Sequence, residues 1–347
     1  MRNRIALVFF SFFSFISLVA AGPAWADDRS TCAQRGHDDR IAACSRLIAK
    51  GGAGDAALFD NRGAEYGEKG DYDRAIADFS EAIRINPKYA QAWRDRGLVL
   101  LRKNELERGI ADLSEAIRLD PKYLDAYNER GMAYVASGDA ERAMADYNAA
   151  IRINPRFKHA YYNRGRLYGT KGDYSRAIAE FSEVIRIDPK HAMAYNLRGY
   201  AYHLAGDTER AVADFSESIR ISPRLAFPYN NRGNVYRQQG RQDRALADYN
   251  EALRLDPQYT AALVNRGMTY EKIGDTARAR ADFDAALAFP QKHDGAKQAQ
   301  DKARERIAVL SDITVKPPGA TSTAVIALPG PSSSKDKRIA LVIGNSA

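Results

Sequence analysis

The chain of 347 residues carries 52 lysines and arginines against 44 acidic residues, which gives a net charge of +8. This modest excess is spread along the chain, whereas a nucleic-acid-binding protein favours a clustered basic stripe, so composition argues against that class. The sequence has no phosphate-binding glycine loop, no His-x-x-x-His and no Gly-x-Ser-x-Gly, and its five histidines are scattered, so no familiar catalytic motif is present.

Residues 1–26 are predicted to be an export signal that is cleaved. Arg2 and Arg4 provide the positive start, residues 5–21 the apolar core, and Ala24-Trp25-Ala26 a small-x-small cleavage site before Asp27. Cleavage would remove two positive charges and leave +6 (8 minus 2) on a mature chain located in the periplasm or outside the cell. The alternative is an uncleaved membrane anchor, because the apolar run is slightly long for a signal.

Cys32 and Cys44, the two cysteines of the chain, fall in an N-terminal segment at 27–55 that is predicted to form a helical cap. Export favours a disulfide between them. On one continuous helix the two would be roughly 18 Å apart, beyond bridging reach, but Gly36-His37 could turn the chain into a hairpin. Two buried free thiols are the alternative. A metal site is disfavoured because there are two sulfur ligands and His37 stands alone.

From residue 56 to 293 the sequence repeats itself seven times at a period of 34 residues. Six prolines keep this interval, namely Pro87, Pro121, Pro155, Pro189, Pro223 and Pro257. An Arg-Gly pair keeps it too, beginning at Arg62, Arg96, Arg130, Arg164, Arg198, Arg232 and Arg266. Large rings at unit positions 4 and 11 and the glycine at position 8 follow helical spacing, which predicts a first helix with a packed face.

Each unit is predicted to contain a second helix after a break. Gly-Asp pairs such as Gly70-Asp71 can end the first helix with glycine and cap the second with aspartate. In the following run Ala75, Phe79, Ala82 and Ile83 would form an inner apolar stripe, and the proline then prevents the helix from continuing. Stacks of such hairpins present a surface for binding.

These residues resemble the tetratricopeptide repeat family, with Gly at position 8 in all seven units, Ala at position 20 in six and an aromatic ring at position 24 in six. The resemblance implies an all-α fold, an α-solenoid in which seven helical hairpins form a right-handed superhelix between capping helices. In the cap, Asp39–Ile48 resembles the second helix of a repeat, with Cys44 at the ring position. One departure is systematic, because position 7 is Arg in every unit where the family usually has a large apolar residue.

Every position-7 arginine is matched by an acid at position 23 of the same unit, namely Asp78, Asp112, Asp146, Glu180, Asp214, Asp248 and Asp282. We expect a structural ladder of ion pairs between the helices. The alternative is that the arginines grip an acidic ligand. The tyrosines are expected to pack rather than to stack on bases.

The family's ligand groove is lined by positions 2, 5, 6, 9, 12 and 13 of each first helix, which are mostly polar here. Asparagine can donate to and accept from a peptide backbone, so a broken series of asparagines would suit an extended peptide. The predicted groove residues are Asn61, Arg94, Asn128, Asn163, Arg166, Asn196, Asn230, Asn231, Asn234, Arg237 and Asn265. Alternatively, these asparagines are merely solvated or cap local backbone.

Three segments follow the repeats. Residues 294–311 are predicted to form a capping helix with Ala303, Ile307 and Leu310 on one face, and the Pro- and Ser-rich stretch at 312–336 a disordered linker. Residues 337–347, Lys-Arg-Ile-Ala-Leu-Val-Ile-Gly-Asn-Ser-Ala, resemble the first strand of a caspase-like cysteine protease domain of peptidase family C14. The family's catalytic His and Cys would lie beyond Ala347. The alternative is an unrelated apolar tail.

The sequence therefore favours an exported, non-catalytic scaffold that binds a protein or peptide, with no cofactor, no metal, no nucleic acid and no membrane contact after signal cleavage. Acidic cell-surface polymers are a further possible ligand. The alternative is the sensor arm of a caspase-like protease whose catalytic domain lies outside this chain.

Overall fold

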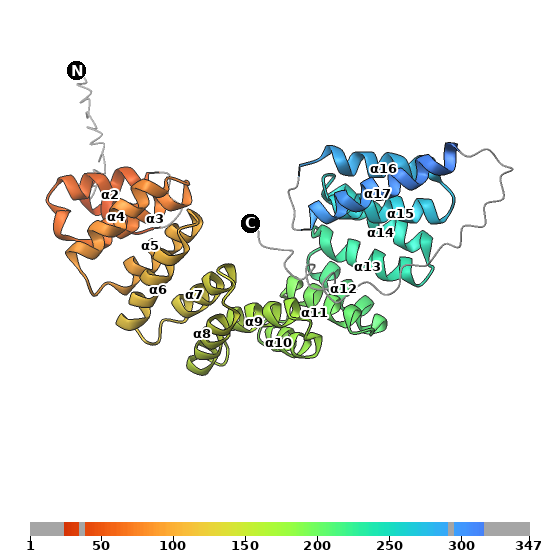
Figure 1. Ribbon diagram of the computed structural model, residues 1–347. Coiled ribbons are helices and arrows are strands. Elements are labelled where there is room, and N and C mark those ends of the chain that lie inside the picture. Colours follow the sequence, from red (N-terminus) through yellow and green to blue (C-terminus); the bar gives the residue numbers. More distant parts are fainter. Residues whose placement is uncertain (1–23, 35–38, 291–294, 316–347) are drawn as a thin grey trace, which may run out of the picture. The chain divides into compact units, whose positions relative to one another are not determined.

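The computed structural model describes residues 24–34, 39–290 and 295–315, which are helical hairpins divided between two compact units (Figure 1). The first unit, up to Asp120, contains the N-terminal cap and two repeats. Its elements are α1 (Ala24–Ala33), α2 (Arg40–Ala49), the 3-10 turn η1 (Gly52–Gly54), α3 (Ala56–Glu68), α4 (Tyr72–Ile85), α5 (Ala90–Arg102) and α6 (Leu106–Leu119).

The second unit, from Pro121, contains five further hairpins and a final helix. Its elements are α7 (Leu124–Ala136), α8 (Ala140–Ile153), α9 (Lys158–Thr170), α10 (Tyr174–Ile187), α11 (Ala192–Leu204), α12 (Thr208–Ile221), α13 (Ala226–Gln238), α14 (Gln242–Leu255), α15 (Thr260–Lys272), α16 (Thr276–Ala288) and α17 (Ala296–Val315). The described residues contain no strand, and the prediction of an all-α hairpin-repeat fold is confirmed.

The predicted helix boundaries have the expected caps. In α12 the Asp207 side chain accepts from the backbone N–H of Arg210, and the same bond begins α4, α8, α10 and α16. Gly206 precedes it with φ +90°, a left-handed conformation that costs glycine little. The second repeat has Asn104 at this place with φ 63°, and asparagine is among the non-glycine residues that tolerate it best.

Six of the seven hairpins are held by a ring of the second helix packed on the glycine of the first, and in the second repeat Leu113 takes the place of the ring against Gly97. Phe79 and Phe181 are 1% and 0% exposed, and the rest of the predicted stripe in α4, Ala75, Ala82 and Ile83, is buried as well. A Cβ atom on Gly63 would lie 3.0 Å from Phe79 Cε1, and one on Gly165 would lie 2.9 Å from Phe181 Cε1. The glycine is therefore needed for the close approach of the two helices.

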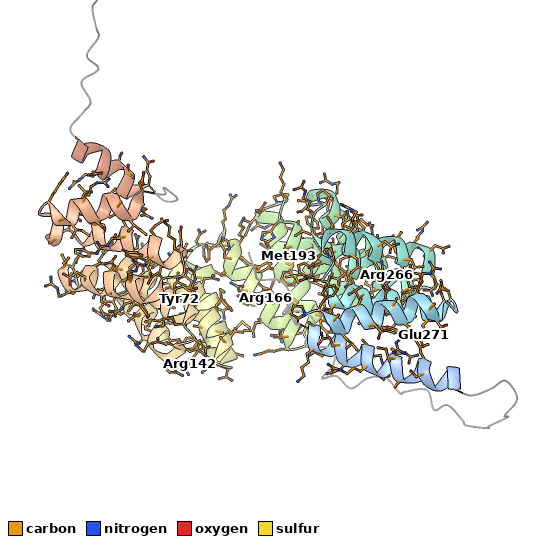
Figure 2. The ribbon with its side chains drawn as sticks, turned by 90° about the horizontal axis from the view of Figure 1, so that it is seen from above. Tyr72, Arg142, Arg166, Met193, Arg266 and Glu271 are labelled. Atoms are coloured by element: carbon orange, nitrogen blue, oxygen red, sulfur yellow. A yellow bond between two sulfur atoms is a disulfide. The ribbon has the colours of Figure 1, made fainter. Side chains whose placement is uncertain are left out.

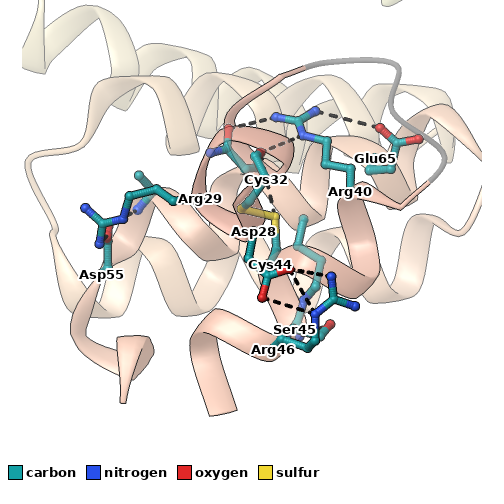
Figure 3. The surroundings of a disulfide bond; sticks show 12 residues. Asp28, Arg29, Cys32, Arg40, Cys44, Ser45, Arg46, Asp55 and Glu65 are labelled. Atoms are coloured by element: carbon teal, nitrogen blue, oxygen red, sulfur yellow. Dashed lines mark hydrogen bonds and ion pairs between the residues drawn. A yellow bond between two sulfur atoms is a disulfide. The ribbon is translucent and has the colours of Figure 1, made fainter. Parts of the chain in front are cut away.

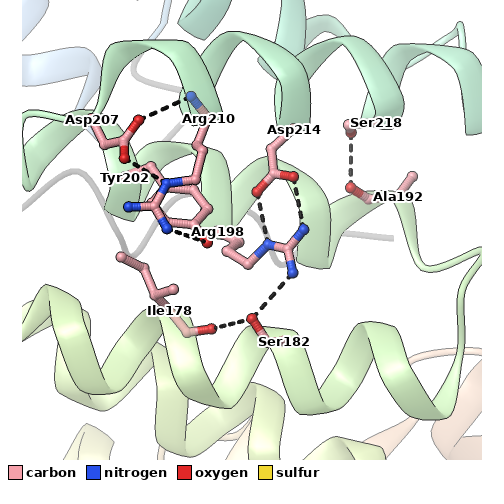
Figure 4. Close-up of polar contacts among 9 residues, drawn as sticks. All are labelled: Ile178, Ser182, Ala192, Arg198, Tyr202, Asp207, Arg210, Asp214 and Ser218. Carbon is pink, nitrogen blue, oxygen red and sulfur yellow. Dashed lines mark hydrogen bonds and ion pairs between the residues drawn. The ribbon is translucent and has the colours of Figure 1, made fainter.

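The predicted ladder of ion pairs is present in all seven repeats. Around Arg198 of α11, Nε and Nη2 donate to the two carboxylate oxygens of Asp214 on α12, each at 2.8 Å, while Nη1 donates to Ser182 Oγ of α10 at 3.1 Å (Figure 4). One guanidinium thus joins its own hairpin to the second helix of the preceding repeat. The pairs are Arg62–Asp78, Arg96–Asp112, Arg130–Asp146, Arg164–Glu180, Arg198–Asp214, Arg232–Asp248 and Arg266–Asp282.

Arginine side chains stack on the tyrosine rings of the first helices. The Arg198 guanidinium lies 5.4 Å from the centre of the Tyr195 ring, and the Arg210 guanidinium lies 4.4 Å from the centre of the Tyr202 ring. The same stacking occurs in other repeats, where an arginine covers Tyr66, Tyr134, Tyr168 or Tyr270. These rings serve packing and cation–π contacts within the repeats.

The N-terminal cap is a hairpin of α1 and α2 pinned by the predicted Cys32–Cys44 disulfide (Figure 3). The two Cα atoms are 5.0 Å apart and both side chains are buried. Beside it lies a residue that the sequence did not single out. Arg40 is 1% exposed, and it donates to the Cys32 carbonyl at 2.9 Å and to Asn61 Oδ1 of α3 at 2.8 Å. The buried arginine therefore joins the cap to the first repeat, with Glu65 3.8 Å away.

Replacing both Cys32 and Cys44 with serine should lower the stability of the cap by about 2 kcal/mol. The disulfide closes a short loop and so restricts the unfolded chain, whereas the unfolded chain of the variant lacks this restriction. Hydrogen exchange of α1 and α2 should accelerate, while exchange of α11 to α16 should stay unchanged. Equal exchange rates for the cap in both proteins would contradict this role.

The final helix covers α15 and α16, with Ala303 and Leu310 buried and Ile307 partly buried against them. It extends to Val315, so the predicted boundary between helix and linker at residue 311 is four residues too early.

Four predictions concern residues outside the described ranges. They are the signal at 1–26 apart from its last three residues, the turn at Gly36-His37, the linker from residue 316 on, and the caspase-like strand at 337–347. The right-handed superhelix likewise stays a prediction.

Candidate functional site

A chain of asparagine amides crosses the first helices of the last three repeats, α11, α13 and α15. Asn265 Nδ2 donates to Asn230 Oδ1 at 2.9 Å, and Asn230 Nδ2 donates to Asn231 Oδ1 at 3.3 Å. Asn231 Nδ2 in turn donates to Asn196 Oδ1 at 3.0 Å. The amides of four asparagines thus form one continuous hydrogen-bonded row.

The repeat period explains this row. An asparagine at position 6 of one first helix bonds an asparagine at position 5 of the preceding one, 35 residues earlier, because equivalent helices stack side by side. The same bond joins Asn163 to Asn128 at 2.9 Å in α9 and α7. Each such pair therefore fixes the register of two neighbouring first helices.

A cavity of about 150 Å³ lies over this row. Five asparagines line it, namely Asn196, Asn230, Asn231, Asn234 and Asn265. The other lining residues are Leu197, Tyr200, Phe227, Tyr259 and Ala261, so none of its ten lining residues is charged. The cavity combines amide groups with apolar and aromatic walls, as binding sites for small neutral groups generally do.

The phenols around the cavity are neutral hydrogen-bonding groups. Burial raises the pKa of Tyr200 and of Tyr259 above the usual range of a phenol, with the Asn230 hydrogen bond opposing the rise at Tyr259. Burial also raises the pKa of Tyr249 to about 12, and its hydroxyl donates to Asn234 Oδ1 at 2.8 Å. These bonds fix the orientation of Asn230 and Asn234.

Two charged residues, Arg237 and Glu271, follow the lining asparagines along their helices. On α13, Arg237 follows Asn234 by three residues and interacts with the Tyr249 phenol. On α15 lies Glu271, which is labelled in Figure 2. It is held by Arg306 of α17, whose Nε donates to Glu271 Oε2 at 2.9 Å. The capping helix therefore neutralises Glu271, while Arg237 has no ion pair with any described residue.

His203 of α11 lies near Arg237. Burial is the larger cause that lowers the pKa of His203, and the positive charge of Arg237 is the smaller one. The folded chain disfavours protonation of this ring, so the unfolded chain binds more protons as the pH falls through about 6.5. We expect stability to decrease from pH 7 to pH 5, and His203→Gln to lose less stability over that interval. Urea unfolding at both pH values measures this, and identical losses in the two proteins would contradict it.

Five of the eleven predicted groove residues line the cavity, and the other six do not. Asn61 accepts from Arg40 of the cap, and Arg94 donates to its neighbour Asp95 at 3.0 Å. Asn128 and Asn163 bond each other and are each 9% exposed, so they serve helix packing. The remaining two are Arg166, which lies by Tyr147 and Tyr162, and Arg237, which lies by Tyr249 and His203.

Four of the predicted groove residues, Asn61, Arg94, Asn128 and Asn163, thus have partners within the fold, and the groove as a ligand site stays a prediction. Sequence reasoning also missed Phe227, Tyr259 and Ala261. Phe227 and Ala261 occupy position 2, a groove position of the family. Tyr259 precedes its helix and was marked by no pattern.

Two further features concern the described residues alone. None of the helices in residues 24–34, 39–290 and 295–315 combines the length and the apolar content needed to cross a membrane. Within the same ranges, no three His, Cys, Asp or Glu side chains gather where a metal ion could be held.

Family profiles match most of the repeat region. A profile described as TPR repeat matches residues 131–172 and 233–274, and two described as tetratricopeptide repeat match 61–123 with 162–226 and 260–293. A 45-residue segment is 40% identical to the uncharacterized protein MJ0572 of Methanocaldococcus jannaschii. The segment covers 13% of this chain and 52% of that protein, so the chain spans about half the length of the curated relative it matches.

Solved structures share the fold. A tetratricopeptide repeat protein from Parabacteroides merdae is 22% identical with a TM-score of 0.57, over 75% of this chain and 98% of that one. Cut9 in the APC/C hetero-tetramer Cut9–Hcn1 is 16% identical with a TM-score of 0.57, over 76% and 52% of the two chains. PilF of Pseudomonas aeruginosa is 16% identical with a TM-score of 0.54, over 63% and 97%.

Proposed function

Because the chain belongs to the tetratricopeptide repeat family, we propose that it is a non-catalytic scaffold that binds an extended segment of a partner protein. The segment would lie across the first helices of the last repeats. The observation that carries this proposal is the row of four asparagine amides beneath a cavity with aromatic walls.

The hydrogen-bonding capacity of the row supports an extended peptide as ligand. Each asparagine amide has two N–H groups and an oxygen with two lone pairs, and the row uses at most one donor and one acceptor site of each. Asn231 and Asn265 are only partly buried, so their remaining groups can face a ligand. A peptide backbone offers alternating donors and acceptors that match them.

The place of action is part of the proposal. An export signal at 1–26 and a disulfide in the cap are both typical of proteins that fold in an oxidising compartment, so we place the protein in the periplasm or outside the cell. The N-terminal residue of the mature protein tests export. Asp27 would support it, whereas a mature chain that begins at Met1 would contradict it.

Capture of partners from a periplasmic extract tests the binding site. Ala261 lines the cavity, so Ala261→Trp should fill it and abolish capture, and Asn231→Ala should weaken capture by removing an amide of the row. Ala213→Trp on the exposed side of α12 is the matched control and should bind like the wild type. A partner that survives Ala261→Trp would bind elsewhere and would overturn the proposed site.

A second function is favoured by residues 337–347, whose charged start and apolar run resemble the first strand of a caspase-like domain. On that hypothesis the repeats are the sensor arm of a protease. The coding sequence after Ala347 tests it. A frame with a His and a later Cys in a protease-like context would support the hypothesis, and unrelated sequence would reject it.

A further inference from the structure

We propose that the cavity over the asparagine row selects a tyrosine side chain of the ligand, and that Arg237 binds an acidic residue adjacent to that tyrosine. This inference rests on the proposed peptide-binding function and adds a recognition rule to it. It follows from the size, the walls and the charges of the site.

The size of the cavity limits the guest to a single side chain. A cavity of about 150 Å³ holds a benzene-sized group, whereas pockets for drug-sized ligands and cofactors are at least about 300 Å³. One six-membered ring with a small substituent therefore fits. An indole is too large unless the walls move.

The aromatic walls favour a ring as guest. Phe227 and Tyr259 already form an edge-to-face pair with ring centres 5.3 Å apart, and Tyr200 completes the wall from α11. Aromatic rings at such distances attract one another beyond the effect of buried area. An aliphatic or amide side chain would forgo this attraction.

The amides distinguish tyrosine from phenylalanine. A phenylalanine ring would displace water from the asparagines and leave their free N–H and C=O groups without partners, which is costly. A phenol hydroxyl can donate one hydrogen bond and accept others, so it can satisfy the groups that the guest covers. A carboxylate or ammonium guest is disfavoured, because none of the lining residues is charged and its desolvation would not be compensated.

Arg237 provides a cation one helical turn beyond Asn234, which lines the cavity. Tyr249 connects the two features, since its hydroxyl donates to Asn234 of the lining and its phenol interacts with Arg237. The Nε of Arg237 is buried without a hydrogen-bond partner among the described residues. Glu271, which holds the same repeat position on α15 as Arg237 on α13, is paired with Arg306. An acidic ligand residue is the complement that this arrangement lacks.

A library of random 12-residue peptides displayed on phage, selected on the full chain, tests the rule. We expect enriched peptides to carry a tyrosine next to aspartate or glutamate. In synthetic copies of the best peptide, Tyr→Phe should weaken binding about tenfold, as the loss of a buried hydrogen bond predicts, and phosphorylation of the tyrosine should abolish it.

Charge reversal tests the second half of the rule. Arg237→Glu should shift the selected neighbour of tyrosine from acidic to basic, a change of specificity that a merely structural role of Arg237 would not produce. Arg224→Glu, at an exposed position in a turn, has the same charge change and should leave the selection unchanged.

The outcomes separate this inference from the proposed function. If the enriched peptides lack tyrosine and do not bind the Ala261→Trp variant, the inference is overturned and the groove function stands. Peptides that bind Ala261→Trp as well as the wild type, or a selection without enrichment, would overturn both.

Discussion

Replacing Arg198 with methionine should lower the free energy of unfolding by about 3 to 5 kcal/mol. Asp214 is 6% exposed, and both of its carboxylate oxygens accept from the Arg198 guanidinium at 2.8 Å. Methionine keeps much of the side-chain volume but leaves a buried carboxylate without its partner, which is the costly way to break a buried ion pair. Urea unfolding followed by circular dichroism measures the loss.

Two further variants show whether the loss comes from the unpaired charge. Arg198→Met combined with Asp214→Leu should recover most of the lost stability, because replacing both partners with apolar groups removes the uncompensated carboxylate. Arg220→Met breaks the exposed pair with Glu217 on the outer surface of α12 and should leave stability unchanged within error. If Arg198→Met behaves like Arg220→Met, the ladder does not stabilise the fold.

The ladder could be predicted from sequence because both partners repeat with the same period. Arg at position 7 and an acid at position 23 occur in every unit, and the structure pairs them in every unit. The third contact, from Arg198 to Ser182 of the preceding repeat, was not predicted, since it depends on how neighbouring hairpins stack. The periodic pattern thus determined the hairpin and left the packing between hairpins open.

The candidate site was predictable only in part for the same reason. Position numbers placed Asn230 and Asn231 on the groove face, but they did not indicate that the two amides bond each other and their neighbours. Asn61, which was also assigned to the groove, accepts a hydrogen bond from Arg40 that the sequence did not indicate. Since Arg40 lies outside the repeats, no periodic pattern pointed to it.

The cavity itself requires side-chain positions that no single-sequence pattern contains. Tyr259 precedes α15 and is 3% exposed, and its ring meets Phe227 of α13. Whether two such rings close a cavity or fill it depends on their rotamers. The residues at the groove positions therefore indicated a polar groove, and the structure added its aromatic walls.

Gly165→Leu should lower the free energy of unfolding by about 3 kcal/mol, because it overpacks the contact between α9 and α10. An added Cβ would lie 2.9 Å from Phe181 Cε1 and 3.0 Å from Glu180 Cβ, and leucine adds three further carbons. Phe181 is 0% exposed, so it can move only by disturbing its own neighbours. Overpacking of such cores typically costs about 1 to 3 kcal/mol, and this contact leaves little room for relief.

Two glycine variants separate this clash from the general effect of replacing glycine. Gly165→Ala gains about 0.5 to 1 kcal/mol from helix propensity, which offsets part of a smaller clash, so its loss should lie well below that of leucine. Gly54 has nothing within 4 Å of an added Cβ and no left-handed backbone, so Gly54→Leu should unfold like the wild type. Since both leucine variants carry the same side chain, equal stability of the two would mean that the helices of the hairpin do not pack through glycine and ring.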